Sequence, residues 1–121
     1  MDKHVLVIDD EDQIRGIYRR MFSAIGLDTI HVFEAKDATQ AVNVMIRRKL
    51  DLVLLDINVP ELNGQEIYEI IQEFDPKLKV IVASVHPIDE QKKMIPFAKD
   101  YYDKSQGPFK LLEKVTSALV F

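Results

Sequence analysis

Two hydrophobic periodicities alternate along the chain. Short, nearly uninterrupted apolar runs rich in β-branched residues are typical of strands that are covered on both faces, and they occur at 5–8, 51–56 and 79–84. Less apolar runs at 29–33 and 99–103 suit flanking strands, which meet water along one face or one edge. The pattern therefore predicts five strands.

Helical spacing fills the segments between these runs. Apolar side chains recur there at intervals of three and four residues, which predicts one buried stripe per helix. Gly26 and Pro76 stand where two of the helices are expected to stop. The predicted helices cover approximately 14–25, 38–46, 67–74, 89–97 and the segment from 108 onward.

A strand and a helix that alternate five times predict a parallel sheet with right-handed crossovers and helices on both faces. The fold class is therefore α/β, a doubly wound (βα)5 sheet. With 121 residues, of which 47% are hydrophobic, the chain matches one globular domain over residues 1–121.

Composition narrows the classes of partner. Acidic residues outnumber basic ones by 20 to 16, for a formal charge of −4, so no overall positive field attracts nucleic acid or an anionic membrane. Cysteine is absent, which excludes disulfides and cysteine-based metal sites. No apolar run approaches the roughly 18 residues of a membrane span, and no secretory leader is visible. We expect a cytoplasmic protein.

Carboxylates follow two of the predicted strands. Asp9 and Asp10 come directly after the first, and Asp56 ends the third. Ligands of such sheets bind at the carboxyl ends of the strands, and in the common order 2-1-3-4-5 the first and third strands are neighbours, roughly 4.8 Å apart. Three adjacent carboxylates repel one another unless a cation or protons compensate. Ligands that are all oxygen favour Mg²⁺.

The same edge of the sheet carries a candidate nucleophile. A carboxylate beside a divalent cation can attack phosphorus, so Asp56 is a candidate acceptor of a phosphoryl group. Ser84 and Lys104 end the fourth and fifth strands, and a hydroxyl and an ammonium can bind charge on phosphoryl oxygens. Each residue alone is more often a cap, a strand-end hydroxyl or a solvated charge. Their joint placement favours a site.

These motifs together resemble a known family. The run Val7 to Glu11 resembles the opening motif of bacterial response-regulator receiver domains. The segment 56–64 resembles the family's phosphoacceptor loop, with Pro60 and Gly64 four and eight residues after the aspartate. The resemblance spans the whole chain, and motifs in register are a specific signal. Three further positions match the family's hydroxyl, switch aromatic and lysine: Ser84, Tyr101 and Lys104.

The resemblance implies a flavodoxin-like receiver fold and a phosphoacceptor signalling switch of a two-component phosphorelay, which is a regulator and not an enzyme. Asp56 would receive its phosphoryl group from a sensor histidine kinase or a histidine phosphotransfer protein, and Ser84 and Lys104 would bind the new oxygens. Ser84 and Tyr101 would then shift, with Tyr101 turning inward. The Mg²⁺ ligands that the resemblance implies are Asp10, Asp56 and the backbone carbonyl of Asn58, with Asp9 acting mainly through water.

The output surface implied by the resemblance is formed by the fourth helix, the fifth strand and the fifth helix, where a downstream protein would bind. Direct contact with nucleic acid or a membrane is not expected. Lys104 is followed by Ser105, whereas family members usually have a proline there, joined through a cis bond that is costly for other residues. The geometry of this loop is therefore open.

Two rival functions share the same residues. A small Mg²⁺-dependent phosphohydrolase would also use Asp56 as its nucleophile, but a chain this short shows no cap over a substrate pocket. A degenerate receiver would bind partners without phosphorylation, and four retained residues argue against it: Asp10, Asp56, Ser84 and Lys104. A flavodoxin-like cofactor binder is disfavoured because the acidic residues 9–12 would repel its phosphate. The kinase, the pathway and the output are not readable from the sequence.

Overall fold

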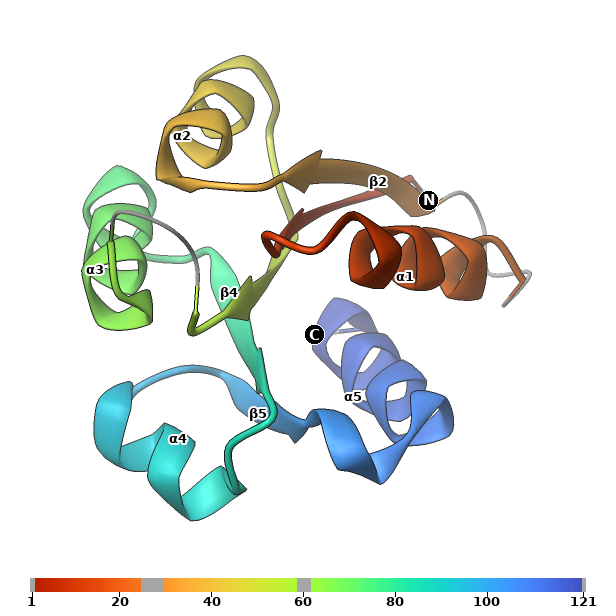
Figure 1. Ribbon diagram of the computed structural model, residues 1–121. Helices are drawn as coiled ribbons and strands as arrows, with labels where there is room; N and C mark the ends of the chain where they lie inside the picture. Colours follow the sequence, from red (N-terminus) through yellow and green to blue (C-terminus); the bar gives the residue numbers. More distant parts are fainter. Residues whose placement is uncertain (1, 25–29, 59–61, 121) are drawn as a thin grey trace.

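A five-stranded parallel sheet with the strand order β2-β1-β3-β4-β5 forms the centre of the computed structural model, which describes residues 2–24, 30–58 and 62–120. Helices cover both faces of the sheet (Figure 1). This arrangement confirms the predicted α/β fold and its strand order. The elements are β1 (Lys3–Ile8), α1 (Asp12–Ala24), β2 (Ile30–Ala35), α2 (Ala38–Arg47), β3 (Leu52–Asp56), α3 (Gly64–Phe74), β4 (Lys79–Ser84), α4 (Ile88–Met94), β5 (Asp100–Asp103) and α5 (Pro108–Val120), with a 3₁₀ helix at Lys104–Gln106.

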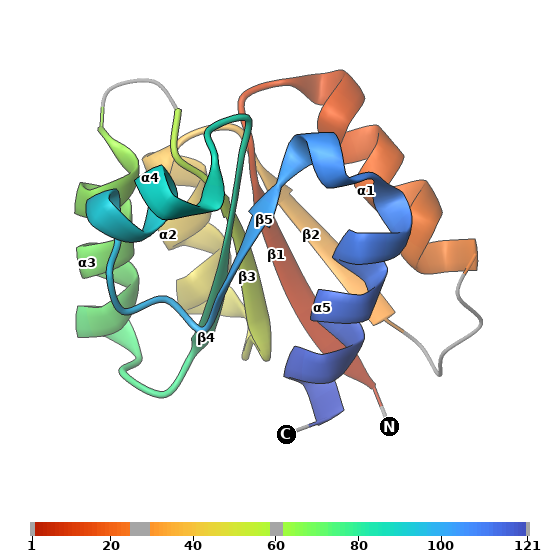
Figure 2. The same cartoon turned by 90° about the horizontal axis from the view of Figure 1, so that it is seen from below.

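The alternation of side chains along the strands divides the core into two layers. Leu6 and Ile8 of β1 pack with α2 and α3, whereas Val5 and Val7 pack with α1 and α5, because successive side chains of a strand point to opposite faces. Figure 2 shows α1 and α5 together on one face, and α2, α3 and α4 on the other. All five residues of β3 are buried, as expected of a central strand in a doubly covered sheet.

Several element boundaries differ from the prediction, and two of the differences have a clear physical cause. Strand β2 extends to Ala35 rather than 33, because its register with β1 continues as far as Ile8. Helix α4 ends at Met94 rather than near 97, and Pro96, which has no N–H group, follows directly after its cap. The predicted helix stop at Gly26 lies outside the described residues, whereas α3 does end before Pro76.

The start of α3 lies against the end of β3. Asn63 caps α3 in a reciprocal pair of hydrogen bonds with Glu66, which satisfies N–H groups at the helix start. A β-carbon added at Gly64 would lie 2.8 Å from the Cα of Ile57, so this position accepts only glycine without displacing the backbone. No helix of the described ranges is long and apolar enough to cross a bilayer.

Candidate functional site

The parallel register gathers the ends of four strands at one edge of the sheet. Ile8 pairs with Leu55, Asp56 with Ala83, and Ser84 with Asp103. The residues that follow β1 therefore meet the last residue of β3. The carboxylates of Asp9, Asp10 and Asp56 each offer an oxygen, and these three atoms lie within 4.8 Å of one another.

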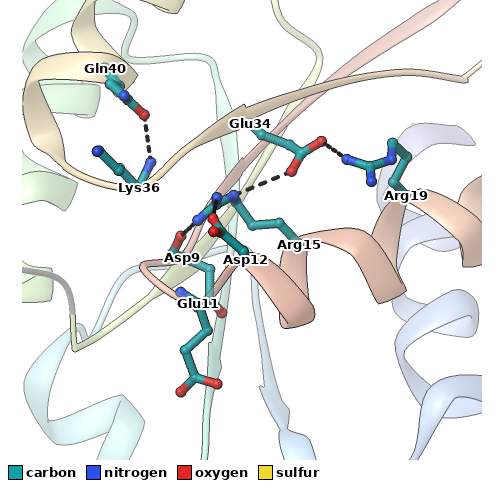
Figure 3. Close-up of polar contacts among 8 residues, drawn as sticks. All are labelled: Asp9, Glu11, Asp12, Arg15, Arg19, Glu34, Lys36 and Gln40. Atoms are coloured by element: carbon teal, nitrogen blue, oxygen red, sulfur yellow. Dashed lines mark hydrogen bonds and ion pairs between the residues drawn. The ribbon is translucent and has the colours of Figure 1, made fainter.

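Asp9 is buried and fixed by hydrogen bonds from several parts of the fold. It is 1% exposed, and its backbone N–H donates to the carbonyl of Ala35 on β2 at 3.0 Å. One carboxylate oxygen accepts from the N–H of Glu11 at 3.0 Å, and the other accepts from Lys104 Nζ at 3.1 Å. Its backbone carbonyl accepts from Arg15 (Figure 3). Both carboxylate oxygens of Asp9 are therefore engaged by protein donors, which fix the orientation of the side chain.

Asp56 is buried in an environment that disfavours its charge. It is 6% exposed, with one oxygen accepting from the N–H of Asn58 at 3.2 Å and the other 3.5 Å from Lys104 Nζ. Burial raises the pKa of Asp56 from its ordinary 3.8 to about 6, Asp9 adds to that rise, and Lys104 and the Asn58 N–H oppose it. Burial and the neighbouring Asp9 therefore both favour the neutral form of this carboxylate.

Lys104 supplies the internal counterion. Its Nζ lies between Asp9 and Asp56, and although burial acts to lower the pKa of Lys104, the carboxylates of Asp56 and Asp9 outweigh it, so the pKa is raised. Lys104 opens the 3₁₀ helix, which Asp103 caps by accepting from the N–H of Ser105 at 2.9 Å. The Lys104–Ser105 peptide is trans, as are the other described peptide bonds, which settles the loop geometry that the sequence left open.

Ser84 and Asn58 flank the carboxylates. Ser84 is fully buried at the end of β4, and its hydroxyl oxygen accepts from the N–H of His86 at 3.1 Å, which leaves its proton as a donor. Asn58 is exposed and forms an isolated bridge with Asn63, which closes the loop after β3. Asp10 is exposed as well, so it presents its carboxylate at the mouth of the pocket.

Tyr101 already lies inward in this structure, whereas the resemblance implies that it turns inward upon phosphorylation. It is buried, its hydroxyl donates to the carbonyl of Ile95, and it accepts from the N–H of Ala98 at 3.3 Å. These bonds fasten the ring to the connection between α4 and β5. Any switching motion of Tyr101 would start from this inward position.

Sequence reasoning missed two polar residues that support the site. Gln91 of α4 is fully buried, and its amide nitrogen donates to the carbonyls of His86 at 2.7 Å and Tyr102 at 3.0 Å. Gln91 lies four residues before the buried Ile95 and therefore on the same side of the helix. A single polar residue on this apolar stripe was the feature of the sequence that could have identified it. Arg15, five residues after Asp10, contacts the Asp9 carbonyl and carries no comparable pattern in the sequence.

The donor set fits a hard divalent cation. Its ligand atoms are oxygens, two of its carboxylates are buried and one is exposed, and Mg²⁺ binds through one or two carboxylates while keeping several waters. Burial raises the pKa of Asp56 and the charge of Asp9 adds to that rise, so a cation bound beside these carboxylates would favour their charged forms. The residues present therefore suit Mg²⁺ better than a soft metal.

The pKa of Asp56 predicts how the stability of the metal-free protein depends on pH. Since the folded pKa of about 6 exceeds the ordinary 3.8, the folded state binds the proton more tightly, and this contribution is present below pH 3.8 and lost as pH rises through 6. In EDTA at pH 8, Asp56→Asn is expected to be more stable than the wild type, by up to about 3 kcal/mol. Urea unfolding at several pH values checks this, and the difference should vanish near pH 4. Parallel curves for the two proteins from pH 4 to 8 would contradict it.

Comparison with known proteins agrees with this geometry. Residues 5–116 match the family described as the response regulator receiver domain. The chain is 31% identical over 117 residues to the chemotaxis protein CheY of Thermotoga maritima, an alignment that covers 93% of this chain and 94% of that protein. It is 30% identical over 86 residues to sporulation initiation phosphotransferase F of Bacillus subtilis, covering 71% of this chain and 67% of that protein.

A solved structure extends the similarity to the whole fold. The response regulator TrrA of Thermotoga maritima, in complex with Mg(2+)-BeF, matches with a TM-score of 0.85 at 27% identity, over 97% of this chain and 99% of that one. The family match and the fold thus cover the same strands and helices that carry the acidic pocket. The chain therefore belongs to the response regulator receiver domain family.

Proposed function

We propose that this chain is the phosphoacceptor switch of a two-component phosphorelay, and that residues 1–121 are one receiver domain. The observation that carries the proposal is the buried carboxylate of Asp56, which lies beside two further aspartates and one lysine. The donor is a phosphohistidine of a sensor histidine kinase or a histidine phosphotransfer protein. An Asp56 oxygen forms a bond to phosphorus while the P–N bond breaks, and the electron pair remains on the donor imidazole.

Each residue of the pocket has a proposed task. Asp10, Asp56 and the carbonyl of Asn58 would hold Mg²⁺, with Asp9 acting mainly through water. When bound, Mg²⁺ supplies positive charge that neutralises the phosphoryl oxygens. The similar response regulator TrrA, solved in complex with Mg(2+)-BeF, supports a Mg²⁺ site but not the identity of each ligand.

Ser84 and Lys104 are the proposed ligands of the phosphoryl oxygens. The Ser84 hydroxyl donates its proton to one oxygen. The Lys104 ammonium, 3.5 Å from Asp56, moves from Asp9 to another. Donors in a buried site from which water is excluded stabilise developing charge more strongly than they would in water.

The output is a change in the surface of α4, β5 and α5. When the Ser84 hydroxyl turns to a phosphoryl oxygen, the loop that carries His86 is drawn along, and Gln91 ties this loop to β5. Tyr101, already bonded to the end of α4, shares the same connection. A downstream protein would dock there, where Phe97 and Phe109 are each 85% exposed.

The proposed role is regulatory and cytoplasmic, without direct contact to nucleic acid or a membrane. The acidic charge of −4 supports partners that are proteins rather than polyanions. One of the described clefts is lined by Lys104 and Tyr102 together with residues of α1 and the start of α5, and none of the three aspartates lines it. Turnover of an external phosphate ester is not part of the proposal.

Intact mass spectrometry tests this function. Incubation with acetyl phosphate and Mg²⁺ is expected to add the mass of one phosphoryl group, which hydroxylamine then removes because it cleaves acyl phosphates. EDTA is expected to prevent the addition. Release of many equivalents of phosphate from p-nitrophenyl phosphate would instead indicate a phosphohydrolase, and a mass that never changes, even with a donor phosphohistidine protein, would indicate a degenerate receiver.

A further inference from the structure

Arg15 of α1 lies directly behind the acidic pocket, and all three of its guanidinium nitrogens are engaged. One terminal nitrogen donates to the backbone carbonyl of Asp9 at 2.6 Å, and Nε donates to a Glu34 carboxylate oxygen at 3.2 Å. The other terminal nitrogen contacts the carboxylate of Asp12. The Arg15 side chain is only 11% exposed, whereas that of Asp12 is 89% exposed, so the contacts with Asp9 and Glu34 are the more shielded ones.

Glu34 anchors this arginine from the outer strand β2. Its second carboxylate oxygen accepts from Arg19, one turn further along α1. Figure 3 shows the row that results: Arg19, Glu34 and Arg15 lie one after another and end at Asp9. The row links the edge strand and the first helix to the loop that carries the aspartates.

We propose that Arg15 is a positioning residue for the cation site, an inference that rests on the proposed function. Arg15 touches neither the cation nor the phosphoryl group; it fixes the Asp9 carbonyl and with it the short connection that presents Asp9 and Asp10. Mg²⁺ demands nearly ideal octahedral geometry, so a small displacement of this connection weakens binding. Groups that orient metal ligands through hydrogen bonds typically change metal affinity by about 10- to 100-fold when they are replaced.

The charge of Arg15 and its positioning role predict opposite changes in Mg²⁺ affinity when the residue is replaced. As a positive charge beside a cation site, it repels Mg²⁺, so charge alone predicts that its removal tightens binding. As a positioning residue, its removal weakens binding. The direction of the change in the Mg²⁺ dissociation constant therefore separates the two roles.

The planar guanidinium group of arginine provides a second way to separate the positioning role from the effect of charge. A lysine at position 15 keeps the positive charge, but its single ammonium cannot hold the Asp9 carbonyl and the Glu34 carboxylate in the fixed geometry of a guanidinium. Arg15→Lys is therefore expected to behave like Arg15→Met rather than like the wild type. Glu34→Gln, which loosens the anchor but leaves Arg15 in place, is expected to have the same direction and a smaller effect.

Isothermal titration of the full chain with Mg²⁺ tests the inference. We expect the dissociation constant to rise about tenfold in Arg15→Met and Arg15→Lys. Arg20→Met removes the same charge from an exposed position of the same helix and is expected to change the constant less than about twofold. Thermal melts in EDTA establish that each variant is folded, and Arg15→Lys and Glu34→Gln carry the test if Arg15→Met does not fold.

A second readout separates positioning from a structural role. The rate of phosphoryl incorporation from acetyl phosphate should return close to the wild-type rate when Mg²⁺ is raised to saturate Arg15→Met. The inference is overturned if the wild type binds Mg²⁺ and is phosphorylated but the dissociation constant for Mg²⁺ is unchanged or smaller in both Arg15 variants. A wild-type chain that binds no Mg²⁺ and gains no phosphoryl group would overturn the proposed function, and this inference with it.

Discussion

Asp56→Asn is expected to abolish the incorporation of a phosphoryl group from acetyl phosphate. An amide cannot form the acyl phosphate bond, and the pocket offers its other two carboxylates in different surroundings: Asp9 is fully buried against Lys104, and Asp10 is exposed. Intact mass spectrometry in the presence of Mg²⁺ should show the phosphoryl adduct in the wild type and none in the variant.

A matched control makes this result specific. Asp89→Asn neutralises an exposed carboxylate of α4, away from the three clustered aspartates, and should be labelled like the wild type. A hydroxylamine-sensitive adduct that persists in Asp56→Asn would show that another carboxylate is the acceptor. Peptide mapping of the persistent adduct would then identify that residue.

Lys104→Met is expected to lower the free energy of unfolding of the metal-free protein by about 2 to 4 kcal/mol, because it leaves two buried carboxylates without their ammonium partner. Lys104 Nζ lies 3.1 Å from Asp9 and 3.5 Å from Asp56, and its side chain is 17% exposed. Urea unfolding in EDTA at pH 8 measures the loss. Mg²⁺ should stabilise the variant more than the wild type, because the cation then neutralises charge that Lys104 otherwise compensates.

The double variant Asp56→Asn with Lys104→Met tests the electrostatic cause. If unpaired charge is the reason for the loss, then Asp56→Asn should stabilise Lys104→Met by more than it stabilises the wild type, so the two substitutions are not additive. Additive effects would indicate that Lys104 stabilises the fold through packing of its alkyl chain instead. Mg²⁺ that fails to stabilise Lys104→Met would also contradict the electrostatic explanation.

The pattern of apolar positions was sufficient to predict the fold class, because periods of 2 and 3.6 are local properties of the chain. The runs 5–8 and 51–56 predicted the two central strands, and their acidic ends predicted a pocket. Element ends were less accurate. Strand β2 reaches Ala35 because β1 beside it offers partners that far, and such pairing is not a property of its own residues.

The sequence by itself determined which residues stand at the strand ends, and thereby which chemical groups the pocket contains. Only the tertiary structure decided how these groups are supported. Arg15 reaches a carbonyl six residues earlier and a carboxylate on a strand, and Gln91 joins the backbone carbonyls of His86 and Tyr102. The inward position of Tyr101 likewise depends on carbonyl and N–H groups of the α4–β5 connection. Contacts of this kind depend on distances across the fold, which spacing along the chain does not encode.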